Sequence, residues 1–123
     1  MKYMLLIYNE EKGWENLSDS QRQHFIGEFG NFTQGLKSKG QWLASSQLAP
    51  TSAATSIRVQ DGKRLLTDGP FAETREQLGG YYLIEAKDLD EAIAIGSRIP
   101  SVAAGAGTVE VRPLIERPAT ATA

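Results

Sequence analysis

The sequence lacks the residue types on which several kinds of protein chemistry depend. Among its 123 residues there is no cysteine, which excludes disulfides, thiolate nucleophiles and thiolate metal sites. It contains a single histidine, His24, so a zinc site would have to rely on carboxylates almost alone, which suits that metal poorly. We therefore expect no metal site and no cofactor.

Strong charge and long apolar segments are also missing. A formal net charge of -2 at pH 7 gives no electrostatic basis for binding nucleic acid or an anionic membrane surface. No segment approaches the roughly 18 apolar residues of a membrane span. The apolar run of residues 3–8 is too brief for a signal peptide, and Asn-Glu-Glu-Lys follows it instead of a small-residue cleavage site. We expect a cytoplasmic protein that binds neither nucleic acid nor membrane.

The chain has the length and composition of one globular domain, and its N-terminal segment is unusual. Residues 2–8 read as a strand in which both alternating sets of side chains are apolar: Tyr3, Leu5 and Ile7 on one side, and Met4, Leu6 and Tyr8 on the other. A strand that is covered on one face only alternates apolar with polar residues. This strand is therefore expected to be buried on both faces.

A polar loop is expected over residues 10–16, followed by a helix. Ser18 and Gln21 have the spacing of a capping box at the start of this helix, and Gly40 is expected to cap its end. Its buried face is predicted from apolar residues spaced four, three and four apart, namely Phe25, Phe29, Phe32 and Leu36. Residues 41–48 then read as a second strand.

Asp61-Gly62 is the strongest hairpin signal in the sequence, and it predicts paired strands over residues 55–60 and 63–67. Residues 78–86 form the next expected strand. Asp88, with Glu91 three residues later, caps a second helix that Pro100 ends, and we expect its buried residues to be Leu89, Ala92, Ile93, Gly96 and Ile99. A loop over residues 101–107 and a last strand over 108–115 complete the prediction.

The predicted order of elements is β, α, β, a hairpin, β, α, β. This is the ferredoxin-like pattern of an α+β protein, with an antiparallel sheet and a hairpin inserted in the middle. Right-handed crossovers place both helices on one face of the sheet, which leaves the other face bare. No element remains to cover the second apolar side of the first strand. The simplest cover is the same face of another copy, so we expect a homodimer.

One phrase in the middle of the chain is more specific than these patterns. Residues 67–71 (Thr-Asp-Gly-Pro-Phe) form a rigid turn, and residues 77–82 (Gln-Leu-Gly-Gly-Tyr-Tyr) follow closely. Together with residues 109–113 (Val-Glu-Val-Arg-Pro), they resemble the DGPF branch of the YCII-related proteins. The resemblance implies a domain over residues 1–115 that forms a dimeric α+β barrel. Residues 116–123 are expected to be a flexible C-terminal tail.

Asp68 is the first candidate for chemistry. A carboxylate at a strand end beside a rigid turn can have a pKa suited to proton transfer, and we predict Asp68 as a catalytic base. The alternative is that its side chain only caps the backbone of residues 69–71 as an Asx-turn. Phe71 is expected to anchor this turn against a core and to line the ligand site.

Arg112 is the second predicted catalytic residue. It shares a strand face with Glu110, so it either forms a plain ion pair at a dimer seam or faces the barrel interior and holds an anionic or enolic ligand. Glu76 and Tyr82 are predicted to bind ligand. Tyr81 and Tyr82 point to opposite faces, so at most one of them lines a pocket.

His24 lies beside the apolar stripe of the first helix and is expected to face solvent. The family resemblance implies a histidine and an aspartate near the end of this helix in some members. Counting back from Gly40, Phe29 and Ser38 occupy those places here. His24 is about 140° around the helix from Phe29 and cannot substitute for the family histidine. Residues 79–80 (Gly-Gly) lack the basic residue of a phosphate loop and instead indicate a bulge or a close backbone approach.

Two functions remain open from the sequence. The first is a cofactor-free isomerase or lyase that acts on a small polar or aromatic compound, with Asp68 as base and Arg112 stabilising negative charge; this is an analogy with similar barrels. The second is a non-catalytic module that binds a metabolite or regulates. A closed interaction scaffold is a third interpretation.

Overall fold

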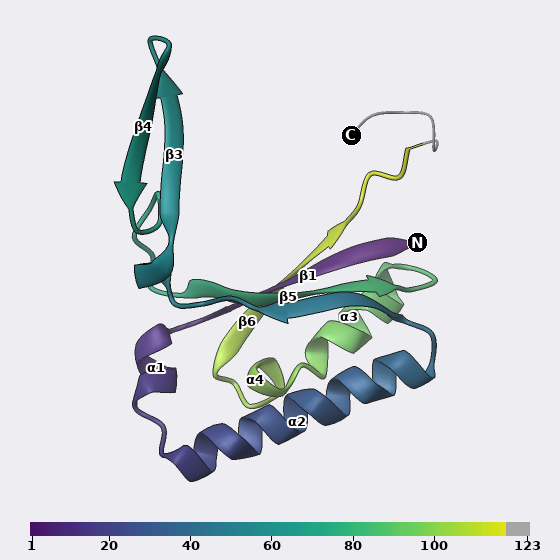
Figure 1. Cartoon of the computed structure of the whole chain (residues 1–123). Coiled ribbons are helices and arrows are strands. Elements are labelled where there is room, and N and C mark those ends of the chain that lie inside the picture. Colours follow the sequence, from purple (N-terminus) through teal and green to yellow (C-terminus); the bar gives the residue numbers. More distant parts are fainter. Residues whose placement is uncertain (118–123) are drawn as a thin grey trace.

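The computed structural model describes residues 1–117, and it confirms the ferredoxin-like α+β fold. Four antiparallel strands form the main sheet in the spatial order β2 (Trp42–Gln47), β5 (Gln77–Glu85), β1 (Lys2–Asn9) and β6 (Gly107–Pro113). The two main helices, α2 (Asp19–Ser38) and α3 (Leu89–Ser97), cover one face of this sheet (Figure 1). The strands β3 (Thr55–Gln60) and β4 (Lys63–Asp68) form a separate two-stranded sheet that rises on the other side (Figure 1).

Local signals set the ends of these elements as the sequence predicts. Ser18 accepts a hydrogen bond from the Gln21 backbone and Gln21 accepts one from the Ser18 backbone, which completes the capping box of α2. Gly40 ends α2 with a φ of 69°. Asp61 and Gly62 both have positive φ, as a tight two-residue hairpin turn requires.

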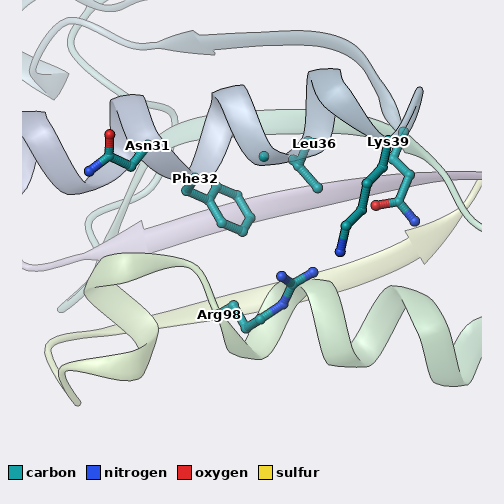
Figure 2. A pocket seen from close by; sticks show the side chains of 7 residues that line it. Asn31, Phe32, Leu36, Lys39 and Arg98 are labelled. Carbon is teal, nitrogen blue, oxygen red and sulfur yellow. The ribbon is translucent and has the colours of Figure 1, made fainter.

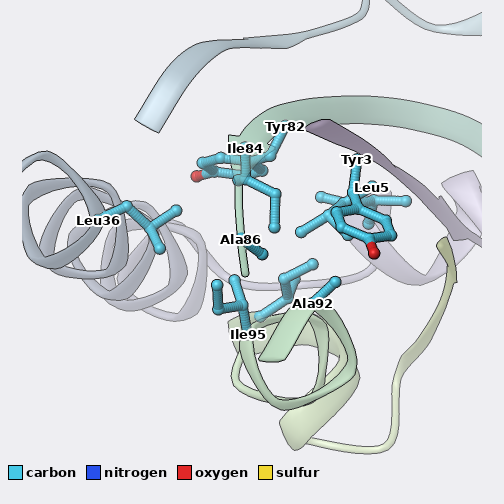
Figure 3. Packing of buried hydrophobic residues seen from close by; sticks show 10 residues of the cluster. Tyr3, Leu5, Leu36, Tyr82, Ile84, Ala86, Ala92 and Ile95 are labelled. Atoms are coloured by element: carbon cyan, nitrogen blue, oxygen red, sulfur yellow. The ribbon is translucent and has the colours of Figure 1, made fainter. Parts of the chain in front are cut away.

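The core lies between the helices and the sheet (Figure 3). Its buried side chains come from β1, β5, α2 and α3, and they are Tyr3, Leu5, Ile7, Leu36, Tyr82, Ile84, Ala86, Ala92, Ile95 and Ile99. Phe29, Phe32 and Trp42 pack around this cluster, as do Val109 and Val111 of β6. The apolar stripe predicted for the first helix is therefore its packed face.

Three local predictions were wrong. Residues 10–16 are not all loop, because Glu11–Glu15 form the short helix α1; Arg22 of α2 holds it by donating hydrogen bonds to the Trp14 and Glu15 carbonyls. Pro100 does not only end α3. It begins another short helix, α4 (Pro100–Ala103), because proline fits the first turn of a helix.

The predicted buried stripe of the second helix was wrong in part. Ala92, Gly96 and Ile99 are buried as expected, but Leu89 and Ile93 are about half exposed. Ile95 is fully buried in their place. The buried face of this segment is therefore formed by Ala92, Ile95, Gly96 and Ile99. Gly96 lies against β6, since a Cβ added there would be 3.4 Å from Val109 Cγ1.

Gly79 and Gly80 mark a β-bulge, as predicted. The pairing of β1 with β5 shifts between Ile7 and Tyr8, opposite these two glycines. Gly80 also allows a close backbone approach, since an added Cβ would lie 2.9 Å from the Ser46 carbonyl oxygen. No helix within residues 1–117 is long and apolar enough to cross a membrane. Of the predicted tail, residues 118–123 lie outside the described part of the chain.

Candidate functional site

The face of the main sheet that carries no helix is the first candidate site, and we call it the open face. Residues that pair directly across antiparallel strands share a face, so the register assigns its members. The middle strands β1 and β5 contribute Met4, Leu6, Tyr8, Leu78, Tyr81 and Leu83 to this face. The β2 side carries Ala44 and Ser46, and the β6 side carries Thr108, Glu110 and Arg112. Met4, Leu6 and Tyr8 are only partly buried here, whereas Tyr3, Leu5 and Ile7 are buried beneath the helices.

A polar network crosses the β6 side of the open face. Tyr8 donates a hydrogen bond of 3.2 Å to Glu110 Oε1. Arg112 holds the other oxygen, Oε2, with both Nε and Nη2 at 2.9 Å. Burial raises the pKa of Tyr8 above its ordinary value of 10.0, and the hydrogen bond to Glu110 and its charge raise it further, while Arg112 lowers it. Glu110 therefore fixes the orientation of the Tyr8 and Arg112 side chains.

Arg112 forms the ion pair with Glu110 that one of the two alternatives includes, and both groups lie on the open face. Its side chain is 67% exposed, so part of the guanidinium group remains free to donate hydrogen bonds to another group on that face. Glu76 lies at the same side of the sheet, where its Oε1 accepts a hydrogen bond of 2.9 Å from the Thr108 hydroxyl.

Asp68 ends β4 and lies in the other, two-stranded sheet. The turn that follows it is held by a 2.7 Å hydrogen bond from Gly69 N to the Ala54 carbonyl, and by the Ser56 hydroxyl, which donates to the Gly69 carbonyl. No hydrogen bond of the Asp68 carboxylate is present among residues 1–117, so the Asx-turn is not formed there. The carboxylate is exposed.

One chain does not bring the two predicted catalytic residues together. Arg112 pairs with Met4 near the start of β1, whereas the chain leaves the hairpin and enters β5 at Gln77, which pairs with Asn9 at the end of β1. Met4 and Asn9 are five residues apart, or about 17 Å along a strand. Arg112 therefore lies toward one end of the main sheet, whereas the chain that carries Asp68 joins this sheet at its other end.

Phe71 and Tyr82, two of the predicted ligand-binding residues, lie apart from the open face. Phe71 is 86% exposed, so the prediction that it anchors its turn on the core is wrong for a single chain. It borders a cavity of about 130 Å³ at the base of the hairpin, with Ser56, Arg58, Thr67 and Pro70 among the lining residues. Tyr82 is buried beneath α2, where its hydroxyl and Thr33 Oγ1 are 2.8 Å apart, and burial raises its pKa.

A second cavity, of about 120 Å³, lies on the helix side of the molecule between α2 and α3 (Figure 2). Lys39 and Arg98, which cap the C-terminal ends of these helices, both extend toward it (Figure 2), and neither has an ion-pair partner within residues 1–117. Gln41 also lines it, and its Oε1 is buried with no hydrogen-bond partner. Sequence analysis missed this site because Lys39 and Arg98 are far apart in the chain.

The charge of this cavity is set by the two cationic side chains and by the C-terminal ends of α2 and α3. Each helix C-terminus carries roughly half a negative charge, so the two ends offset about one of the two positive charges. About one positive charge remains beside Gln41 Oε1, an oxygen that accepts hydrogen bonds.

His24 is exposed, as predicted, and it pairs with Glu28 on its own helix, 2.6 Å away.

Comparison with known proteins agrees with these features. The family model described as the YCII-related domain matches residues 1–117. This chain belongs to the YCII-related family. The uncharacterised protein R00369 of Rhizobium meliloti (strain 1021) is 34% identical over 114 residues, which cover 93% of this chain and 92% of R00369. The uncharacterised protein YjpA of Bacillus subtilis (strain 168) is 42% identical over 55 residues, which cover 45% of this chain and 61% of YjpA.

YCII-related membership gives the fold and leaves the chemistry to the residues of this chain. The match extends across β1, the hairpin and β6, so the open face and its Tyr8–Glu110–Arg112 network lie inside the family domain. The residues that the structure gathers on this face are Arg112 and Glu76 of the predicted set. Tyr8, which the sequence analysis treated only as an apolar strand residue, joins them through Glu110.

Proposed function

We propose that this YCII-related chain acts as a cytoplasmic homodimer whose two open faces enclose a site for a small polar or aromatic compound. The observation that carries the proposal is an apolar open face with a fixed polar network at one side. A contiguous exposed apolar patch marks an interaction surface in a soluble protein. Two cavities within residues 1–117 have volumes of about 120 and 130 Å³, well below the roughly 300 Å³ of a site for a drug-sized compound, so we expect a second copy to complete a larger site.

The reaction that best suits such a site is a proton transfer that needs no cofactor, of the isomerase or lyase kind. Asp68 would take a proton from a carbon next to a carbonyl group, and the electron pair would move onto the carbonyl oxygen. Arg112 would stabilise the enolate that forms, because a cation held in a water-poor site favours developing negative charge. If the substrate has a double bond conjugated with this enolate, return of the proton to the far carbon of that double bond completes an isomerisation with no other reactant.

Glu76, Phe71 and Tyr82 have different parts in this proposal. Glu76 lies beside the open face and would contact the ligand there. Phe71, exposed in one chain, would close the rim of the dimeric site. Tyr82 would act from beneath the sheet, where its hydrogen bond with Thr33 holds β5 against α2.

The test is a thermal-shift screen of small carbonyl compounds and aromatic acids on the native protein and Asp68→Asn, with Glu73→Gln as a control on a nearby exposed carboxylate. A ligand that stabilises the native and Glu73→Gln proteins but not Asp68→Asn supports Asp68 as a site residue. Equal stabilisation of all three removes Asp68 from the site. Light scattering on the same samples must give twice the chain mass of 13.4 kDa; a monomer at micromolar concentration would end the proposal.

A second candidate function is non-catalytic binding of a small metabolite, and the cavity between α2 and α3 favours it. One residual positive charge beside the free Gln41 Oε1 suits a monoanion that also carries a hydroxyl donor, such as a small hydroxy acid. The matched probes are glycolate, which has the hydroxyl, and acetate, which does not. Saturable NMR shifts near Gln41 with glycolate, weaker with acetate and lost in Arg98→Gln, support this function. Equal shifts with both probes, or none, contradict it.

A further inference from the structure

The hairpin of β3 and β4, residues 55–68, extends away from the body of the molecule, and we call it the arm (Figure 1). Its two strands pair with each other and belong to no larger sheet. Neither strand makes an extended contact with another helix or strand within residues 1–117. The arm base is attached to the body through Glu11 of α1, whose carboxylate accepts hydrogen bonds of 2.7 and 2.9 Å from Thr51 N and Thr51 Oγ1.

The register of the arm separates its side chains into two different faces. One face carries Thr55, Arg64 and Asp68 together with three apolar side chains, because Ile57 pairs with Leu66 and Val59 with Arg64. We call it the apolar face of the arm after Ile57, Val59 and Leu66. These three side chains are 66%, 68% and 57% exposed. The opposite face carries Ser56, Arg58, Gln60, Lys63, Leu65 and Thr67 and is mostly polar.

An isolated two-stranded hairpin is marginally stable in water, and it needs packing against another element to persist. A flat apolar face on a hairpin with two free edges is also an aggregation hazard. The apolar face of the arm therefore requires a cover, and the body of its own chain does not supply one.

We propose that the apolar face of the arm docks on a second copy of this chain, so that the arm of each protomer packs against the other protomer of the dimer. This inference rests on the homodimer of the proposed function. The arm and the open face lie on the same side of the sheet (Figure 1), so one two-fold operation brings both surfaces of one copy against the other. Six residues per strand give the arm a length of about 20 Å, while facing sheets lie about 10 Å apart, so the arm reaches beyond the partner's sheet.

The docked arm also has a consequence for the site. Thr55 pairs with Asp68, and both lie on the same arm face as Ile57 and Leu66. A two-fold axis that lies between the two facing sheets and is perpendicular to their strands reverses the strand direction from one copy to the other. The end of one main sheet at which the arm is attached then lies over the end of the other sheet that carries Met4 and Arg112. Asp68 of one protomer then faces Arg112 of the other, and the site is complete only in the dimer.

The direct test uses the absence of cysteine in the native chain. A spin label on Val59→Cys, in unlabelled protein mixed with an equal amount of ¹⁵N-labelled native protein, broadens only resonances of the other protomer. We expect broadening at β1 near Met4 and at β6 near Arg112. A label on Gln60→Cys, on the opposite arm face, provides the matched control and should broaden these resonances less. Equal broadening from both labels, or broadening confined to the other end of the sheet, contradicts the proposed docking.

A second measurement uses dimer affinity. Ile57→Ser combined with Val59→Ser should raise the dimer Kd at least tenfold, whereas Leu65→Ser on the opposite face should change it less than twofold. The arm lies outside the core, so circular dichroism should show all variants folded. A native dimer with no intermolecular broadening and an unchanged Kd overturns arm docking and leaves the proposed function standing. A native monomer overturns both.

Discussion

Gly80 offers a test of how tightly the centre of the sheet is packed. It lies in β5 between β1 and β2, where it pairs with Ile7 and Gln47. A Cβ at this position would be 2.9 Å from the Ser46 carbonyl oxygen and 3.6 Å from the Gln47 Cα. Ordinary contacts begin near 3.4 Å, so Gly80→Ala requires the two strands to separate by about 0.5 Å (3.4 minus 2.9). The atoms that must move belong to backbone, which cannot rotate away.

The neighbouring glycine provides a matched control. A Cβ at Gly79 would meet only the Asn9 side chain, at 3.4 Å or more. Neither glycine has a positive φ, so alanine is allowed by the backbone at both positions. Gly79→Ala should therefore be neutral or stabilising by up to about 1 kcal/mol, because alanine restricts the unfolded chain.

The expected magnitude for Gly80→Ala follows from two opposing terms. Overpacking costs about 1–3 kcal/mol, and the restricted unfolded chain returns about 0.4–1 kcal/mol. The midpoints of these ranges give a net loss of about 1.3 kcal/mol (about 2 minus about 0.7), or a fall in Tm of roughly 4–8 °C for a chain of this size. Urea unfolding followed by circular dichroism measures both variants at one fixed protein concentration, because the stability of any self-associating protein depends on concentration. If Gly80→Ala is as stable as Gly79→Ala, the close approach of β2 to β5 is not as described.

Three further predictions concern individual hydrogen bonds. Ser18→Ala removes the capping box of α2 and should cost about 1 kcal/mol in urea unfolding, whereas Ser20→Ala, inside the same helix, should change little. Burial raises the pKa of Tyr82 above 10.0, so the folded state holds its proton longer and stability should fall as pH rises above 10; Tyr82→Phe should flatten this fall in alkaline unfolding curves. Glu110→Gln removes the carboxylate that raises the pKa of Tyr8, so absorbance titration should show one of the four tyrosines ionising at lower pH, and an unchanged curve would refute the contact.

Features that depend on neighbouring residues could be predicted from the chain alone. Ser18 with Gln21, Gly40, Asp61 with Gly62, and Asp88 fix helix ends and a turn through bonds that span a few residues. Alternation in residues 2–8 indicated a strand with two apolar sides, and the order of elements then limited the topology to the observed fold. Tyr81 and Tyr82 fell on opposite faces because the side-chain period of a strand is two.

The contacts between distant residues depend on packing in three dimensions. The contacts that hold α1 to Arg22, and the burial of Ile95 in place of Leu89 and Ile93, belong to the tertiary packing; neither leaves a local signal in the sequence. The exposure of Phe71 and the separation of Asp68 from Arg112 follow from the arm, whose direction is set by the body at its base. Local propensities leave several conformations nearly equal in free energy, and long-range packing determines which of them is the most stable. These features could therefore be found only in three dimensions.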